Sequence, residues 1–173
     1  MKKALLLHGF MSNEESFFLP DTKNKLEALN YEVFSKSYPS PNNPNIEQWT
    51  SSYLELNQKE YDLVIAHSLG GTFALNLITR DQLQTKKLVM LGSSIGPKNN
   101  AGMNTFLTPP LELEKVKANV AQIIIMQSFD DPWTLPVYGQ VALQSLNAIG
   151  LFYSDKGHFE TTTLPNEIWK LIN

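Results

Sequence analysis

Short apolar runs alternate with longer stretches of helical pattern along the chain. Most of the runs are continuously apolar, as in strands of a parallel sheet that is covered on both faces. The stretches between them carry apolar residues at helical spacing. We expect strands at 4–8, 31–34, 63–66, 87–91, 122–126 and 149–153, and helices at 21–29, 46–56, 72–79, 137–147 and 164–172.

This alternation predicts an α/β fold with three layers, α/β/α, and a doubly wound, mostly parallel sheet of six strands. A chain of 173 residues can bury a core without disulfides. The sequence shows no internal repeat, and it has no linker that would separate two domains. We therefore expect a single domain over residues 1–173.

Two stretches interrupt the alternation. Residues 37–45, "SYPSPNNPN", are rich in proline and asparagine and predict an irregular loop. Residues 93–110 form a long connection rich in glycine, proline and asparagine, and such connections are often lids or binding loops. We expect a short lid-like loop here, with a plain surface excursion as the alternative. Its Met103, Phe106 and Leu107 either line a pocket or pack on the domain.

Composition narrows the function classes. Hydrophobic residues make up 42% and charged residues 18%, and the net charge is −3 without a basic stripe, which argues against a nucleic-acid partner. The absence of cysteine excludes disulfides and thiolate chemistry, and it fits a reducing compartment. The start, "MKKALLLHGF", has four apolar residues in a row, whereas a signal peptide needs about 7–15. We expect a buried first strand, a cytoplasmic location and no membrane partner.

Ser68 lies between a predicted strand and a predicted helix, in "LVIAHSLGGTFAL". That position is a sharp turn at the carboxyl edge of the sheet, where open α/β sheets bind ligands. The residues two before and two after the serine, Ala66 and Gly70, are both small, as in a nucleophile elbow. Ala66 departs from the usual glycine by one methyl group. The alternative, a phosphate cradle at Gly70 and Gly71, lacks the Walker and dinucleotide glycine patterns.

A serine nucleophile needs a base, and the chain has three histidines. His67 is expected to point away from the serine and to pack or cap. His8 ends the first strand, and we expect it to line the site rather than to act as the base. His158, in "SDKGHFE", follows the last strand and reaches the same edge of the sheet, so we predict that it is the base. The three histidines offer no metal-ligand spacing, and we expect neither a metal nor a cofactor.

The orienting acid is expected in "SFDDPWTLP", after the preceding strand. Asp130 and Asp131 compete for this role. Pro132 follows Asp131 and stiffens the turn, which favours Asp131, with Asp130 second and Asp155 third. The chain order Ser, Asp, His is that of α/β-hydrolases. Trp133 beside the acid and Phe159 beside the base either shape a pocket or pack.

The first strand ends in "LLLHGF" beside the elbow. Its backbone can turn the N–H of Phe10 toward a developing oxyanion, and the N–H of Leu69 is the expected second donor. The alternative is that His8 and Gly9 only turn the chain.

These residues resemble the small serine hydrolases of the group that contains YdeN and retinoblastoma-binding protein nine, within the α/β-hydrolase fold. The resemblance runs nearly end to end, through "HGF", "YPSPNNPNIEQW", "VIAHSLGG", "LELEKVKANVAQIIIMQSFDDPW" and "GHFE". It implies Ser68 as nucleophile, Asp131 as acid and His158 as base. It also implies a minimal α/β-hydrolase without the usual first antiparallel strands, with strand order 2-1-3-4-5-6.

We expect acyl transfer from an ester, thioester or amide, with a small-molecule acyl substrate and carboxylesterase activity as the main hypothesis. The rival is a catalytically weak protein of the same fold that acts as a protein-binding module. The presence of Ser68, Asp131 and His158 together argues against this rival, because a scaffold has no need of all three. The oligomeric state stays open.

Overall fold

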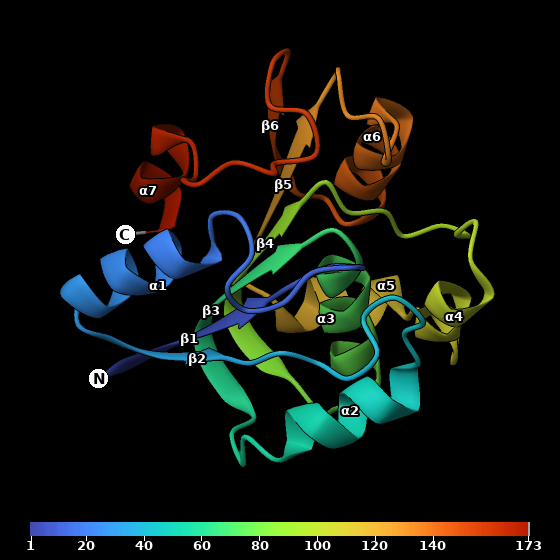
Figure 1. Cartoon of the computed structure of the whole chain (residues 1–173), viewed down its shortest axis with the longest axis horizontal. Helices are drawn as coiled ribbons and strands as arrows, with labels where there is room; N and C mark the ends of the chain where they lie inside the picture. Colours follow the sequence, from blue (N-terminus) through green and yellow to red (C-terminus); the bar gives the residue numbers. More distant parts are fainter. Residues whose placement is uncertain (173) are drawn as a thin grey trace.

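The computed structural model describes residues 1–172, and its centre is a six-stranded sheet. The strand order is β2-β1-β3-β4-β5-β6, and every neighbouring pair is parallel, which confirms the predicted topology. The strands are β1 (Lys2–Leu7), β2 (Tyr31–Ser35), β3 (Glu60–His67), β4 (Gln84–Leu91), β5 (Gln122–Ser128) and β6 (Ile149–Tyr153) (Figure 1).

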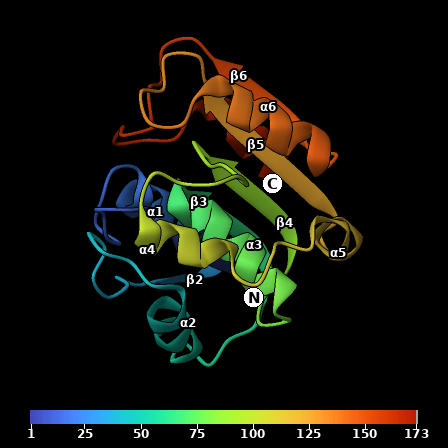
Figure 2. The same cartoon turned by 90° about the vertical axis from the view of Figure 1, so that its right-hand side faces the viewer.

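Helices cover both faces of the sheet. They are α1 (Leu19–Ala28), α2 (Ile46–Leu54), α3 (Leu69–Thr79), α4 (Ala101–Asn104), α5 (Leu113–Asn119), α6 (Pro136–Ser145) and α7 (Asn166–Ile172), with a 3₁₀ turn η1 (Thr105–Leu107). Helices α1 and α7 share a hydrophobic cluster on one face, while α2, α3, α5 and α6 pack on the other. In Figure 2, α3 lies at the centre of the layer that α2, α3, α5 and α6 form.

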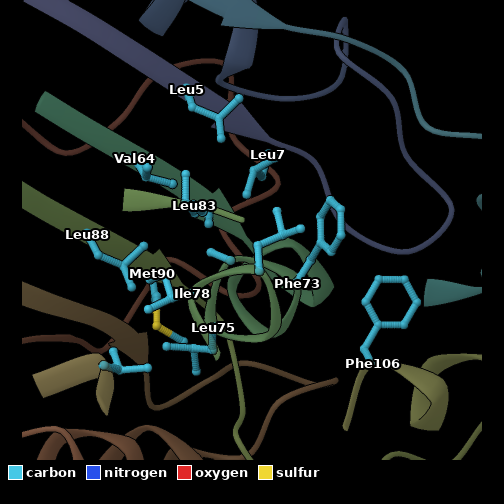
Figure 3. Packing of buried hydrophobic residues seen from close by; sticks show 14 of the residues in the cluster. Leu5, Leu7, Val64, Phe73, Leu75, Ile78, Leu83, Leu88, Met90 and Phe106 are labelled. Atoms are coloured by element: carbon cyan, nitrogen blue, oxygen red, sulfur yellow. The ribbon is translucent and has the colours of Figure 1, made fainter. Parts of the chain in front are cut away.

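Alternate residues of each central strand enter the two clusters, as the two-residue period of a strand requires. Val64 and Ala66 of β3 face α3, whereas Leu63 and Ile65 face α1 and α7. Figure 3 shows Val64 and Leu88 directed toward α3 from neighbouring strands. Because both faces are buried, these strands read as continuous apolar runs.

Helix α3 is the most deeply buried helix, since every residue from Leu69 to Thr79 is buried. Its Phe73 meets an aromatic cluster that comes from three other segments. The ring centroids of Trp49 and Phe106 lie 5.5 and 5.7 Å from that of Phe73, and Tyr38 stacks on Trp49 at 5.0 Å. The cluster anchors the irregular loop 37–45 and the segment 93–110 to the start of α3.

Segment 93–110 contains α4 and η1 and is therefore not a structureless connection. Phe106 is fully buried in the core beside Trp49. The side chain of Asn76 donates to the carbonyl oxygens of Phe106 and Thr108 at 3.0 and 3.2 Å. Of the two roles that the sequence allowed for Phe106, pocket wall or packing, the structure shows packing.

Helix α5 was not predicted. It has seven residues, of which only Val116 is buried. So short a segment shows too few apolar residues at helical spacing for the sequence pattern to predict a helix. Among residues 1–172, none of the helices combines the length and hydropathy needed to span a bilayer.

Candidate active site

Ser68 occupies the sharp turn between β3 and α3. Its backbone has φ 54° and ψ −120°, a conformation that costs an L-residue about 1–3 kcal/mol. Its N–H donates to the carbonyl of Leu91 at 2.8 Å, and its carbonyl accepts from the hydroxyl of Ser93 at 2.8 Å. The end of β4 and the loop that follows it therefore hold the strained turn from both sides, as in a nucleophile elbow.

The elbow requires small residues because β1 passes directly against it. A Cβ on Gly70 would lie 2.7 Å from the carbonyl oxygens of both Leu7 and His8. A Cβ on Gly9 would lie 2.8 Å from the Cβ of Ser68. Ala66 is fully buried in the core on the α3 side, so its extra methyl group is accommodated there.

The strain at Ser68 gives a prediction about stability. Ser68→Gly is expected to be about 1 kcal/mol more stable than Ser68→Ala, because only glycine adopts this backbone conformation without strain. Denaturant unfolding of the two variants measures the difference. Equal stability, or a more stable alanine variant, would show that the turn carries no strain.

Three side chains from separate loops meet at this edge of the sheet. His158 Nε2 lies 2.9 Å from Ser68 Oγ, and His158 Nδ1 lies 2.8 Å from Asp131 Oδ2. Both His158 and Asp131 are buried, with Asp131 only 3% exposed. An ionised carboxylate only accepts, so Nδ1 carries the proton and Nε2 is free to accept from the serine hydroxyl.

The carboxylate of Asp131 is fixed by its own turn. Its Oδ1 accepts from the backbone N–H groups of Trp133 and Thr134 at 2.8 and 2.9 Å. This leaves Oδ2 for the histidine at 2.8 Å and for the side-chain amide of Gln127, which donates to it at 3.3 Å. Asp130 points elsewhere, since its Oδ1 accepts from the Ser128 hydroxyl and from the Gly157 N–H. These two hydrogen bonds, that of Ser128 first, lower the pKa of Asp130.

Asp155, the third candidate for the acid, pairs with Lys156 at the surface. Of the three candidate acids, only Asp131 contacts His158. Within residues 1–172, no group of three or more histidine, aspartate or glutamate side chains is arranged to hold a metal ion.

The two backbone donors expected for an oxyanion lie next to these groups. Leu69 is the first residue of α3 and follows Ser68, and Phe10 follows Gly9, which packs against Ser68. Neither N–H has a hydrogen-bond partner in the part of the chain that the structure describes. Both are therefore available to a ligand.

His8 does not face the site as an open side chain. Its Nδ1 donates to the carbonyl of Gly9 at 2.8 Å, and its Nε2 accepts from the N–H of Tyr38 at 2.9 Å. Burial lowers its pKa, so the ring is neutral and joins β1 to the loop 37–45. Phe159 is fully buried on the α1 side of the sheet, and Trp133 is 73% exposed. Of the four residues considered for a pocket, only Trp133 lies open to solvent.

His67 makes a contact with His158 that the sequence did not predict. Its ring packs on Phe17 and Phe18, as expected of a histidine that points away from Ser68. Its Nε2 also donates to the backbone carbonyl of His158 at 2.7 Å. Burial, and next the nearby charge of His158, lower the pKa of His67 to about 4. No sequence signal beyond its place before Ser68 pointed to this contact.

The lowered pKa of His67 makes the stability of the fold sensitive to acid. Between pH 6.5 and about 4 the unfolded chain binds a proton at His67 that the folded chain does not. Stability therefore falls as the pH is lowered through this window, by up to about 3 kcal/mol from this group. Denaturant unfolding at pH 7 and pH 4.5 is expected to show a smaller loss for His67→Gln than for the parent chain. An equal loss in both would contradict the buried, neutral imidazole.

Comparison with known proteins identifies the family of this chain. A family model described as serine hydrolase matches residues 4–164. Serine hydrolase RBBP9 from Rattus norvegicus is 28% identical over 133 residues, which cover 76% of this chain and 72% of that protein.

Solved structures show the same fold. The ydeN gene product of B. subtilis superposes with a TM-score of 0.87 at 20% identity, covering 99% of this chain and 98% of that one. The methylesterase MES16 from Arabidopsis superposes with a TM-score of 0.72 at 11% identity, covering 99% and 97%. The chain therefore belongs to the serine hydrolase family and has an α/β-hydrolase fold of the YdeN and RBBP9 type.

Proposed function

We propose that this protein hydrolyses small carboxylic esters through an acyl-enzyme on Ser68. The observation that carries the proposal is the continuous hydrogen-bond chain from Asp131 Oδ2 through His158 to Ser68 Oγ, with distances of 2.8 and 2.9 Å. A serine hydroxyl is a weak nucleophile unless such a base and orienting acid adjoin it.

The reaction proceeds in two halves. Ser68 Oγ bonds to the substrate carbonyl carbon while His158 Nε2 takes the hydroxyl proton, and the carbonyl electron pair moves to oxygen. When the intermediate collapses, the bond to the leaving alkoxide breaks and His158 returns the proton to it. Water then attacks the acyl-enzyme with His158 again as base, which releases the carboxylic acid and the free serine.

Two backbone donors serve the oxyanion in this mechanism. The N–H groups of Leu69 and Phe10 lie beside Ser68 without a partner in residues 1–172. Such a donor contributes about 3 kcal/mol to stabilising the transition state. Neither belongs to a flexible side chain, so both are oriented before the substrate arrives.

The surroundings favour a small and accessible acyl substrate. Ser68 is partly exposed at the edge of the sheet, and Phe106 of the 93–110 segment is committed to the core. Two large apolar side chains next to the aspartate pair, Phe129 and Trp133, are exposed to solvent. We place esters ahead of amides because an alkoxide leaves more readily than an amine.

A chain-length series tests the proposal. The p-nitrophenyl acetate, butyrate and octanoate esters are expected to be hydrolysed with the highest kcat/KM for the short chains, and Ser68→Ala to be inactive. A thioester and an anilide with the same acyl group define the leaving-group preference. Hydrolysis that survives in Ser68→Ala would contradict the proposal, as would an inactive folded parent chain.

A further inference from the structure

His67 contacts the backbone of the residue that we propose as the base. It is the last residue of β3, and the alternation of the strand places its side chain on the α1 side of the sheet, opposite to Ala66. The base loop, which we define as residues 156–159, passes over it there. The two imidazole rings lie 5.0 Å apart, and His67 Nε2 reaches the carbonyl oxygen of His158 at 2.7 Å.

The base loop needs external support because its backbone is strained at Phe159. Gly157 has φ 50°, and Phe159, a bulky residue, has φ 58°. Positive φ is costly for such a residue and persists only where the surroundings impose it. His158 directly precedes Phe159, so relaxation of Phe159 would displace the His158 ring from Ser68.

Hydrogen bonds hold the base loop from two sides. On one side, Ser128 Oγ accepts from the N–H of Lys156 at 3.0 Å, and Asp130 Oδ1 accepts from the N–H of Gly157 at 2.9 Å. On the other side, the carbonyl of His158 accepts from His67. His67 thus supplies the side-chain hydrogen bond to the backbone of His158 itself.

We propose that His67 is a positioning residue for His158: its imidazole N–H fixes the His158 backbone so that Nε2 stays within reach of Ser68. The proposal rests on the proposed function, since it assigns His67 to the same hydrolytic site. His67 touches neither the substrate nor the reacting atoms.

The contact requires a proton on Nε2 of His67, and burial keeps the ring neutral. A carbonyl oxygen only accepts, so Nε2 of His67 carries the proton, and Nδ1 has no partner within residues 1–172. The titratable groups that act on His67 are His158, Asp131 and His8, and its pKa of about 4 keeps it neutral. A second positive charge would otherwise oppose protonation of His158 during catalysis.

Three substitutions of His67 distinguish a positioning role from a packing role. The amide nitrogen of His67→Gln reaches the place of Nε2, whereas that of His67→Asn is too short, and His67→Leu has no donor. We expect kcat for p-nitrophenyl acetate to fall by about 10–100-fold in the asparagine and leucine variants, because a small displacement of the base is costly. KM is expected to change less than twofold, and His67→Gln to retain most of kcat.

The pH profile of kcat/KM and the thermal unfolding of each His67 variant are measured together with these rates. The acid limb of the pH profile of kcat/KM is expected to shift in the asparagine and leucine variants and not in the glutamine variant. If kcat follows thermal stability alone, with glutamine no better than leucine, His67 is a packing residue and the proposal is overturned. If the parent chain shows no Ser68-dependent hydrolysis, the proposed function fails instead.

Spectroscopy of the unmodified protein tests the proposal without any variant. ¹⁵N and ¹H NMR is expected to show His67 as the neutral Nε2–H tautomer from pH 5 to pH 8. An Nδ1–H tautomer would overturn the proposal, because Nε2 could then not donate to the carbonyl of His158.

Discussion

Asp131→Asn is expected to lower kcat for ester hydrolysis by about 10⁴-fold, because it imposes the wrong tautomer on the base. In the structure, Oδ1 of Asp131 accepts from two backbone N–H groups, those of Trp133 and Thr134. An asparagine would keep its oxygen there and turn its NH₂ group toward Nδ1 of His158. The imidazole would then carry its proton on Nε2, where it cannot accept from Ser68.

Asp130→Asn is the matched control for this substitution. The Asn oxygen can still accept from the Ser128 hydroxyl and the Gly157 N–H, which are the partners of Asp130 Oδ1. We expect kcat to stay within about tenfold of the parent value, since only charge-assisted strength is lost. Rates and thermal unfolding are measured together. A loss at Asp130 as large as that at Asp131 would contradict the assignment of Asp131 as the acid.

Gly70→Ala is expected to reduce both activity and stability. The new Cβ would lie 2.7 Å from two backbone oxygens, those of Leu7 and His8, and neither can yield without moving the end of β1. That movement also displaces Phe10, the proposed oxyanion donor. We expect kcat to fall at least about 100-fold and the free energy of unfolding to fall by about 1–3 kcal/mol.

Gly96→Ala is the control for the glycine substitution, because a Cβ at that position meets no atom within 4 Å. It is expected to leave kcat and the unfolding transition nearly unchanged. If Gly70→Ala behaves like Gly96→Ala in steady-state rates and in denaturant unfolding, β1 does not restrict the elbow in solution.

The sheet and the elbow were predictable from local pattern. Continuous apolar runs indicated strands buried on both faces, and a small-x-Ser-x-Gly sequence between a strand and a helix indicated the turn at Ser68. The positive φ of Ser68 and the contacts of Gly70 give the physical reasons for that pattern.

Other features depend on contacts between distant segments. Asp130 and Asp131 are neighbours with the same chemistry, and which of them contacts His158 depends on the turn at Trp133 and Thr134. His67 meets a carbonyl 91 positions away, and periodicity carries no trace of such a contact. Phe106 belongs to the aromatic core although its segment reads as a loop.

Intact-protein mass spectrometry after exposure to a fluorophosphonate tests the central claim most directly. The reagent needs an activated serine but no knowledge of the substrate, and Ser68→Ala and His158→Ala are treated in parallel. A single adduct on the parent chain, mapped to Ser68, absent in the first variant and much slower in the second, is the predicted result. No adduct on a folded parent chain, or one that persists in Ser68→Ala, would contradict the account.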